Sequence, residues 1–189
     1  MLLLLALLAA GCGGGASSPR SLAELTNPFL GLEHSAWLAG AIARLASPQE
    51  IQDYLALRDD QQAEAFIQAF WDRRDPAPDK PGNPFRETFD QRAADADRLY
   101  SEAGFLGRRT DRGIVYVLYG PPEKVDHEVS PVPEGPPIEV WIYSAHAPSG
   151  LDGKRPGPRR FIKRGDLTVL YFPGLRPGPL APQLEPPNP

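Results

Sequence analysis

The sequence lacks most of the patterns from which catalytic and metal sites are built. It contains one cysteine, so no disulfide can form within the chain, and only three histidines. The nearest approach to a metal cluster is Asp126-His127-Glu128, but adjacent residues point in different directions and no second cluster has ligand spacing. No serine stands in a nucleophile elbow, and no glycine-rich phosphate loop joins a strand to a helix. We therefore expect no metal and no cofactor.

The chain also lacks a surplus of basic charge. It has 20 Lys and Arg residues against 24 Asp and Glu, for a formal net charge of -4 and a pI near 5.4. Proteins that bind nucleic acid normally carry a clear positive surplus, so we expect no nucleic-acid partner. The 41% of hydrophobic residues suffices for one domain with a core, while 23 prolines and 18 glycines indicate loops and tails.

Long apolar runs are missing, and the one short run stands at the start of the chain. Residues 2–10 read LLLLALLAA, which is too short to span a bilayer but fits the core of a signal peptide. The small residues at 9–11 precede Cys12 and resemble the lipobox of bacterial lipoproteins. This resemblance implies cleavage before Cys12, acylation of its thiol and a durable lipid anchor in the cell envelope, on either the inner or the outer membrane.

The signal peptide has one alternative, a buried apolar segment in which the cysteine is a small hydrophobe. The position at the start of the chain and the Gly/Ser-rich residues that follow favour the signal peptide. We therefore divide the chain into four parts. They are a signal peptide (1–11), the lipidated Cys12 with a flexible linker (12–31), a folded domain (32–172) and a Pro-rich tail (173–189).

Helix signals fill the first part of the folded domain. Apolar residues near helical spacing predict a helix over 32–45. Ser47-Pro48-Gln49-Glu50 has the pattern of a capping box and begins a second helix. Asp59-Asp60 predicts a third, which Asp75-Pro76 ends. Asn83-Pro84 begins a fourth helix that runs to residue 100.

Strand signals follow. The nearly continuous apolar run at 113–119 predicts a buried strand, and the alternation at 138–144 predicts a second strand with Ile138, Val140 and Ile142 on one face. Residues 160–164 and 167–172 flank Gly165-Asp166 and predict a hairpin. Helices first and strands second indicate an α+β fold, with N-terminal helices packed on a small, mainly antiparallel sheet.

Four motifs stand in order along this body. They read FWDRRDP at 70–76, NPFRE at 83–87, GRRTDRG at 107–113 and YGPP at 119–122. Together they resemble the GWxTD-domain proteins, bacterial envelope proteins that are often predicted lipoproteins and have no established biochemical function. The resemblance covers roughly residues 48–144. Arg108 stands where the motif has tryptophan, whereas Thr110, Asp111, Arg112 and Gly113 keep the pattern.

The segment Thr110-Asp111-Arg112-Gly113 is the first candidate site. An aspartate and an arginine just before a strand could present a charged pair to a ligand at the rim of the sheet. We favour a structural interpretation, in which Thr110 and Asp111 cap a turn, Arg112 pairs with a carboxylate and Gly113 permits the turn.

The motifs also carry Arg74, Asp75 and Arg86. Arginine near the end of a helix complements the helix dipole, and Asp75 before proline stops the helix, so no ligand is needed to explain these two. We expect a salt-bridge network that joins Arg74, Asp75 or Arg86 to Asp111.

Six basic side chains gather at the C-terminal end of the domain. They are Lys154, Arg155, Arg159, Arg160, Lys163 and Arg164. On a tethered protein they could meet anionic headgroups or an acidic partner. A solvated loop and an edge strand protected by charge would explain them equally well.

These observations favour a noncatalytic envelope lipoprotein whose domain serves binding or assembly with another envelope protein. The alternative is an envelope hydrolase acting on wall or polysaccharide, with Asp111 and Glu139 as acid and base. That alternative requires both carboxylates in one cleft. A structural spacer without a specific ligand is a third possibility.

Overall fold

The computed structural model describes residues 21–130 and 132–173. The signal-peptide segment, Cys12 and nearly all of the Pro-rich tail lie outside these described residues. Within them the chain forms short 3-10 helices, α-helices and strands. Their bounds are η1 (Ala23–Leu25), α1 (Ile42–Leu45), α2 (Pro48–Leu55), α3 (Asp60–Asp72), α4 (Pro84–Tyr100), η2 (Gly107–Arg109), α5 (Asp111–Tyr119), β1 (Lys124–Glu128), β2 (Ile138–Ile142), β3 (Arg159–Arg164) and β4 (Leu167–Leu170).

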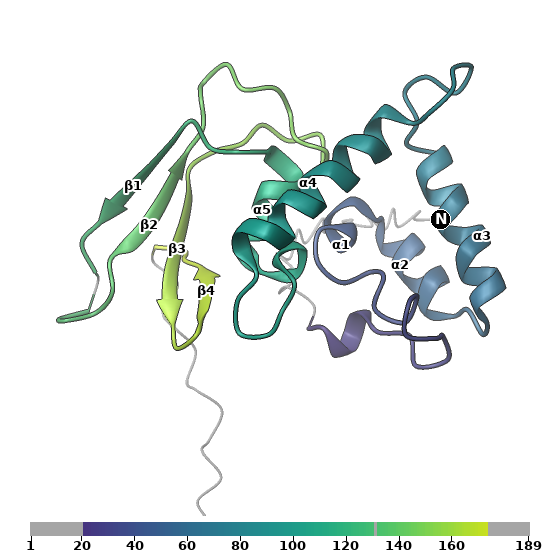
Figure 1. The fold of residues 1–189 in the computed structure, drawn as a ribbon, viewed down its shortest axis with the longest axis horizontal. Helices are drawn as coiled ribbons and strands as arrows, with labels where there is room; N and C mark the ends of the chain where they lie inside the picture. The colour runs from purple at the N-terminus through teal and green to yellow at the C-terminus, as the bar shows by residue number, and fades with distance from the viewer. Residues whose placement is uncertain (1–20, 131, 174–189) are drawn as a thin grey trace, which may run out of the picture.

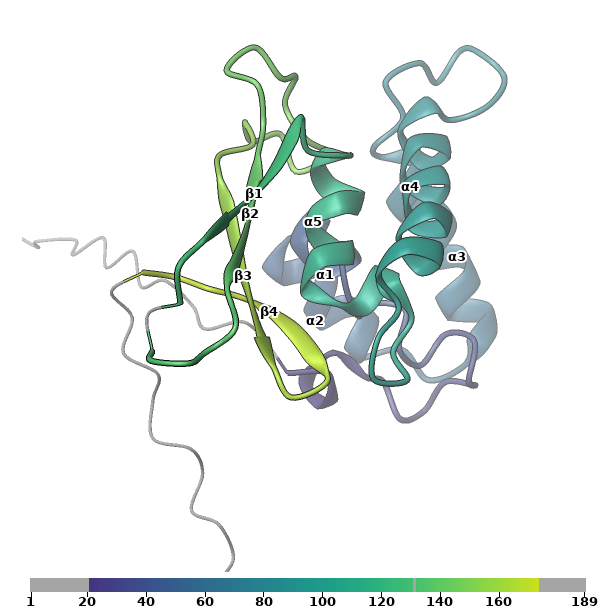
Figure 2. The same cartoon turned by 60° about the vertical axis from the view of Figure 1, so that its left-hand side comes forward.

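Helices and strands form two layers (Figures 1 and 2). The strands make one antiparallel sheet in the order β1-β2-β3-β4, so each strand pairs with the next in sequence. Figure 2 shows the helices on one side of this sheet, with α5 between the sheet and α4. The predicted α+β fold is therefore confirmed. Among the described residues, no helix combines the length and the apolar character that a membrane crossing requires.

The predicted helix starts are confirmed by their caps. Ser47 and Glu50 form a reciprocal capping box, in which each side chain accepts a hydrogen bond from the other residue's backbone N–H. Asp59 caps α3 and Asn83 caps α4, each by accepting from the backbone N–H three residues on. The Asn83 amide also donates to the carbonyl of Trp71 at 2.9 Å and so joins the two helices.

The helix predicted over 32–45 is wrong for most of its length. Residues 32–41 form successive turns, and only Ile42–Leu45 is helical. Gly40 adopts a left-handed conformation (φ 82°), which interrupts a helix. A Cβ at this position would lie 2.5 Å from the carbonyl oxygen of Arg108, so the turn also permits close contact with the motif segment.

The strand predicted over 113–119 is also wrong, because these residues form helix α5. Val115, Tyr116, Val117 and Leu118 are all buried. A helix covered on several sides is apolar all round, so its sequence has the same continuous apolar run as a buried strand. Thr110, the N-cap, is the local signal that favours the helix.

The predicted alternation in β2 is confirmed. Trp141 packs with Phe161 in the core shared with the helices, at a ring-centroid distance of 4.9 Å. Ile138 and Val140 lie in a second, smaller cluster with Ile162. The predicted β3–β4 hairpin is present as well, and Gly165 at its turn has a φ of 59°.

The folded domain begins earlier than predicted, because residues 21–31 are packed and do not form a flexible linker. Leu25 and Leu30 are buried in the main core. The amide of Asn27, which is 0% exposed, donates to the carbonyls of Tyr54 and Leu57 and accepts from Phe29 N–H. This buried amide fastens the segment to the C-terminal end of α2.

Candidate functional site

The motif at 107–113 lies where α4, η2 and α5 come closest together. A Cβ at Gly107 would lie 1.8 Å from the carbonyl oxygen of Ala96, and a Cβ at Gly113 would lie 1.7 Å from the carbonyl oxygen of Gly107. Neither distance leaves room for a side chain. The two glycines of the motif are therefore required by backbone packing.

Thr110 supplies the cap of α5. Its buried hydroxyl accepts from Gly113 N–H at 3.2 Å and lies 2.9 Å from the carbonyl oxygen of Gly107, to which it donates. The hydroxyl thereby satisfies one of the free N–H groups at the helix start. The structural interpretation of this residue is confirmed.

Asp111 joins the first turn of α5 to the last strand of the sheet. One carboxylate oxygen accepts from the backbone N–H of Leu170 at 2.6 Å, across 59 residues of sequence. The sequence predicted a cap at this position, whereas the structure uses the carboxylate to hold β4. A negative charge in the first turn also complements the helix dipole.

Arg112 lies at the centre of an ion-pair cluster between the two layers. Its guanidinium lies 2.8 Å from Glu102 and 3.5 Å from Glu139, and all three side chains are largely buried. Glu102 also accepts from the backbone N–H and the hydroxyl of Thr168, each at 2.9 Å. The predicted pairing of Arg112 with a carboxylate is confirmed. The Nε of Arg112 is buried without a hydrogen-bond partner.

Glu102 and Thr168 were not identified from the sequence. They lie 66 residues apart, and neither stands in a motif. Their roles depend on how the sheet meets the helices, so the local sequence carries no signal for them.

The two carboxylates of the hydrolase alternative have different surroundings. Asp111 lines a cleft formed with the helical layer, and Glu139 is absent from the lining of that cleft. Glu139 instead accepts from the indole N–H of Trp141 and pairs with Arg112. The cleft beside Asp111 therefore does not hold both carboxylates, and the geometry of this cleft gives the alternative no support.

The predicted salt-bridge network to Asp111 is wrong. Arg74 pairs with Glu50 at 2.7 Å and donates to the carbonyls of Leu45 and Phe70. Arg86 lies 3.6 Å from the carboxylate of Asp90, four residues further along α4. Each of these two arginines is engaged by another carboxylate, so neither pairs with Asp111.

Asp75, the third residue of that prediction, also has a local partner. Its carboxylate accepts from the backbone N–H of Ala77 at 2.8 Å and forms a turn after α3. The helix itself ends at Asp72, three residues before the predicted stop.

The ion pair of Arg74 and Glu50 strongly lowers the pKa of the Glu50 carboxyl. Hydrogen bonding to the Arg74 guanidinium lowers the pKa of the Glu50 carboxyl from 4.5 to about 2. The same guanidinium lies 3.6 Å from the ring centroid of Phe70. Arg74 thereby holds the end of α1, the start of α2 and the end of α3 together.

Arg108 occupies the position of the motif tryptophan. It pairs with Asp97 at 2.6 Å, and its backbone N–H donates to the other oxygen of that carboxylate at 2.8 Å. The side chain is 44% exposed. It lines a groove that is also lined by Trp37, Trp71 and Phe89. The substitution therefore places a charge at the edge of an aromatic surface.

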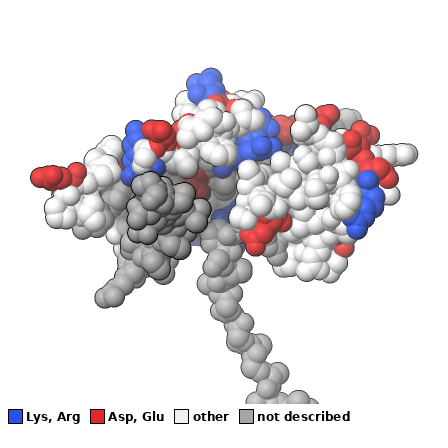
Figure 3. Space-filling view, turned by 90° about the horizontal axis from the view of Figure 1, so that it is seen from below, with Lys and Arg blue, Asp and Glu red and all other residues white. Residues whose placement is uncertain are grey.

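The six basic residues at 154–164 do not form one surface. Arg160 makes a two-pronged ion pair with Glu128, and Arg159 donates to the hydroxyl of Tyr119 at 3.3 Å. The other four are exposed, and no ion pair holds them among the described residues. They are Lys154, Arg155, Lys163 and Arg164. Seen from below, acidic and basic groups are interspersed and do not gather into a continuous field of one sign (Figure 3).

The residues considered for metal binding lie on β1. Asp126 pairs with Lys124 and Glu128 pairs with Arg160, so both carboxylates already have cationic partners. Within residues 21–130 and 132–173, no group of three or more His, Cys, Asp or Glu side chains converges to hold a metal ion.

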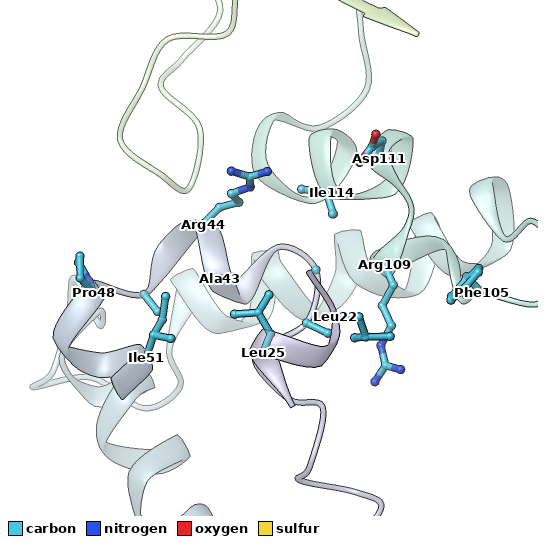
Figure 4. Close-up of a pocket in the computed structure, with 13 residues that line it drawn as sticks. Leu22, Leu25, Ala43, Arg44, Pro48, Ile51, Phe105, Arg109, Asp111 and Ile114 are labelled. Atoms are coloured by element: carbon cyan, nitrogen blue, oxygen red, sulfur yellow. The ribbon is translucent and has the colours of Figure 1, made fainter. Parts of the chain in front are cut away.

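A cleft of about 380 Å³ opens beside the motif (Figure 4). Its walls come from η1, α1, α2, the loop before η2 and the first turns of α5. Arg44, Arg109 and Asp111 are the charged residues among its lining, and the remainder is mainly apolar.

In the comparison with known proteins, one family model matches a stretch of the chain that includes the motif. The model, described as the GWxTD domain, matches residues 18–150. The match extends the resemblance toward the N-terminus, so it includes the packed segment around Asn27. No curated protein and no solved structure matches the chain.

Proposed function

This chain belongs to the GWxTD-domain family, and we propose that it is a bacterial envelope lipoprotein, anchored through lipid on Cys12, whose domain binds a partner without catalysing a reaction. One observation supports a noncatalytic role. The polar side chains of the motif are bonded to other parts of the domain. Thr110, Asp111 and Arg112 each bond to another element of the domain. Such groups stabilise a structure and are not free to react.

The anchor rests on the sequence around Cys12. A short apolar run and three small residues precede the cysteine, as in bacterial lipoproteins. The packed domain begins by residue 21, soon after the cysteine, which suits a body held close to a membrane surface. Several acyl chains would make the attachment durable.

The proposed contacts are two separate pairs of basic residues that make no ion pair among the described residues, together with the Pro-rich tail at 173–189. Lys154 and Arg155 lie in an exposed loop, and Lys163 and Arg164 lie at the β3–β4 turn. A partner with an acidic surface fits this charge, and electrostatic attraction would speed its association. The partner is an envelope protein, since the anchor keeps the domain there.

Crosslinking in intact cells tests this proposal. The protein is then captured from detergent-solubilised membranes and compared with a Cys12→Ser variant. We expect a stoichiometric partner that is captured with the anchored protein and lost with the variant. Attachment to the membrane without any enriched partner would contradict the assembly role, and a variant that stays in the membrane fraction would contradict the anchor.

Charge reversal tests the contact surface. Lys154→Glu combined with Arg155→Glu should reduce capture of the partner several-fold. Arg98→Glu combined with Lys80→Glu is the matched control, because both are exposed cations outside this surface and the two reversals change the net charge by the same amount. Equal loss in both variants would show a nonspecific effect of net charge.

A further inference from the structure

The cleft beside the motif has the character of a small-molecule site. Its volume of about 380 Å³ lies within the range of about 300–1,000 Å³ that is typical of ligand pockets. Leu22 and Phe105 stand at the cleft and remain 46% and 45% exposed. An apolar ligand that covers these side chains removes their surface from water, and this favours binding. The apolar lining consists of Leu22, Leu25, Ala39, Ala43, Ala46, Pro48, Ile51, Phe105 and Ile114.

The charge in this cleft is mainly positive. Arg44 and Arg109 are exposed, and among the described residues neither makes an ion pair or a side-chain hydrogen bond. Asp111 is the one acidic residue of the lining, and its carboxylate is engaged by Leu170 N–H. In Figure 4 the two arginines lie on different sides of the cleft and point away from each other. An anionic group would therefore find a cationic partner at either end.

We propose that this cleft binds an amphipathic small molecule, an apolar chain that ends in an ionised carboxylate or phosphate. The chain would lie against the wall formed by Leu25, Ile51 and Ile114, and the anionic end would pair with Arg44 or Arg109. Arginine binds both carboxylate and phosphate through parallel N–H donors, so the same site accepts either head group.

The proposed anchor would supply such ligands, and only this part of the inference rests on the proposed function. Leu22 lies ten positions after Cys12 in the sequence. A fully extended chain of that length spans at most about 35 Å, so the cleft would stay close to the membrane surface, where amphiphiles gather. The binding itself depends on the cleft alone.

Calorimetric titration of the full chain carrying Cys12→Ser tests the inference without an anchor. The probes are dodecanoate, dodecyl phosphate and dodecyltrimethylammonium, each below its micelle concentration. We expect saturable binding of one or both anionic probes and at least tenfold weaker binding of the cation. Preference for dodecyl phosphate would indicate a phospholipid-like ligand, and preference for dodecanoate a fatty acid. Equal binding of the cationic probe would overturn the proposal.

Three variants locate the binding. Arg44→Glu combined with Arg109→Glu should weaken the binding of the anionic probe at least tenfold. Each single variant should weaken it less, because the other arginine can still hold the head group. Both arginines are exposed, so the folded state should persist, which circular dichroism checks. Arg98→Glu is the matched control, at an exposed arginine of α4 outside the cleft lining, and should change the affinity less than twofold. An affinity that no cleft variant lowers, or that the control lowers equally, would place the probe elsewhere.

The assembly role and the amphiphile site can be refuted independently of each other. A soluble Cys12→Ser chain that binds the anionic probe supports the cleft whatever the capture experiment finds. A captured partner with no probe binding would leave the assembly role intact and reject the cleft as an amphiphile site.

Discussion

At the scale of single residues, Arg74 and Glu50 organise the helical layer. Their contact joins α2 to α3, and the Glu50 side chain is only 15% exposed. The Glu50 carboxylate also completes the capping box of α2 by accepting from Ser47 N–H. One buried carboxylate therefore serves both a helix start and a contact between helices.

Replacing Glu50 by Gln should destabilise the protein in a pH-dependent way. The pKa of the folded-state carboxyl is about 2 against 4.5, so its contribution is present above pH 4.5 and is lost as pH falls toward 2. The full shift corresponds to about 3 kcal/mol. Glu50→Gln should lower the free energy of unfolding by about that amount at pH 7, with the difference vanishing near pH 2. Urea unfolding across this range measures it.

Glu64→Gln is the matched control for that experiment, because Glu64 is exposed on α3. It should leave stability nearly unchanged at every pH. A difference between wild type and Glu50→Gln that stays constant from pH 7 to pH 2 would refute the assigned ion pair.

Asn27 is a second residue whose loss should be costly. Asn27→Ala would leave the carbonyls of Tyr54 and Leu57 without their donor and Phe29 N–H without its acceptor. Buried polar groups without partners cost about 1–3 kcal/mol each, and partial entry of water reduces the sum. We expect a loss of about 3 kcal/mol in denaturant unfolding. Gln68→Ala removes an exposed amide that, within the described part of the chain, bonds Asp72, and this change should cost less than about 0.5 kcal/mol.

At the scale of elements, α5 connects the motif to the sheet. Its first turn carries Asp111 and Arg112, and these two side chains contact β4, β2 and the loop after α4. The motif therefore fixes how the helical layer and the sheet meet. This role explains why the polar side chains of the motif bond to other residues of the domain.

Removal of the Asp111 carboxylate should loosen β4 selectively. Asp111→Ala deletes the acceptor of Leu170 N–H, whereas Asp111→Asn keeps an oxygen at the same place. Hydrogen exchange at Leu170 should therefore accelerate in the alanine variant by tenfold or more and change much less in the asparagine variant. Asp79→Ala, in an exposed turn, serves as the control. Unchanged protection at Leu170 in Asp111→Ala would contradict the contact.

The elements also differ in how well the sequence predicts them. The capped starts at Ser47, Asp59 and Asn83 were predictable because their signals are local. The helix at α5 was not predictable, because it is covered on several sides and its apolar residues therefore lack the periodicity that separates a helix from a strand. The residues of the site also differ in whether their roles can be predicted from neighbouring residues. The cap at Thr110 follows from neighbouring residues, whereas Glu102 and Asn27 acquire their roles from contacts distant in sequence.

At the scale of the whole molecule, helices and sheet share one core. The main hydrophobic cluster includes Leu25 near the N-terminal end, Trp71 in α3, Val117 in α5, and Trp141 and Phe161 in the sheet. A core that crosses both layers couples them, so we expect them to unfold together.

Equilibrium unfolding should therefore be a single transition. Tryptophan fluorescence reports Trp37, Trp71 and Trp141, which lie in both layers, and helical circular dichroism reports the helices alone. The two signals should give the same midpoint in denaturant. Midpoints that differ would show that the helical layer and the sheet are separate cooperative units.

The contact between Asp111 and Leu170 also sets the order in which the chain can fold. Helices α1 to α4 lie within the first hundred residues, whereas the contact between Asp111 and Leu170 closes a loop of 59 residues. Closing such a loop costs chain entropy before its contacts form, which slows folding. During synthesis from the N-terminus, β4 and its contact with Asp111 must wait until residue 170 has emerged. Until then Arg112 and Glu102 lack Thr168, so the domain completes its fold only when nearly all of its chain has been delivered.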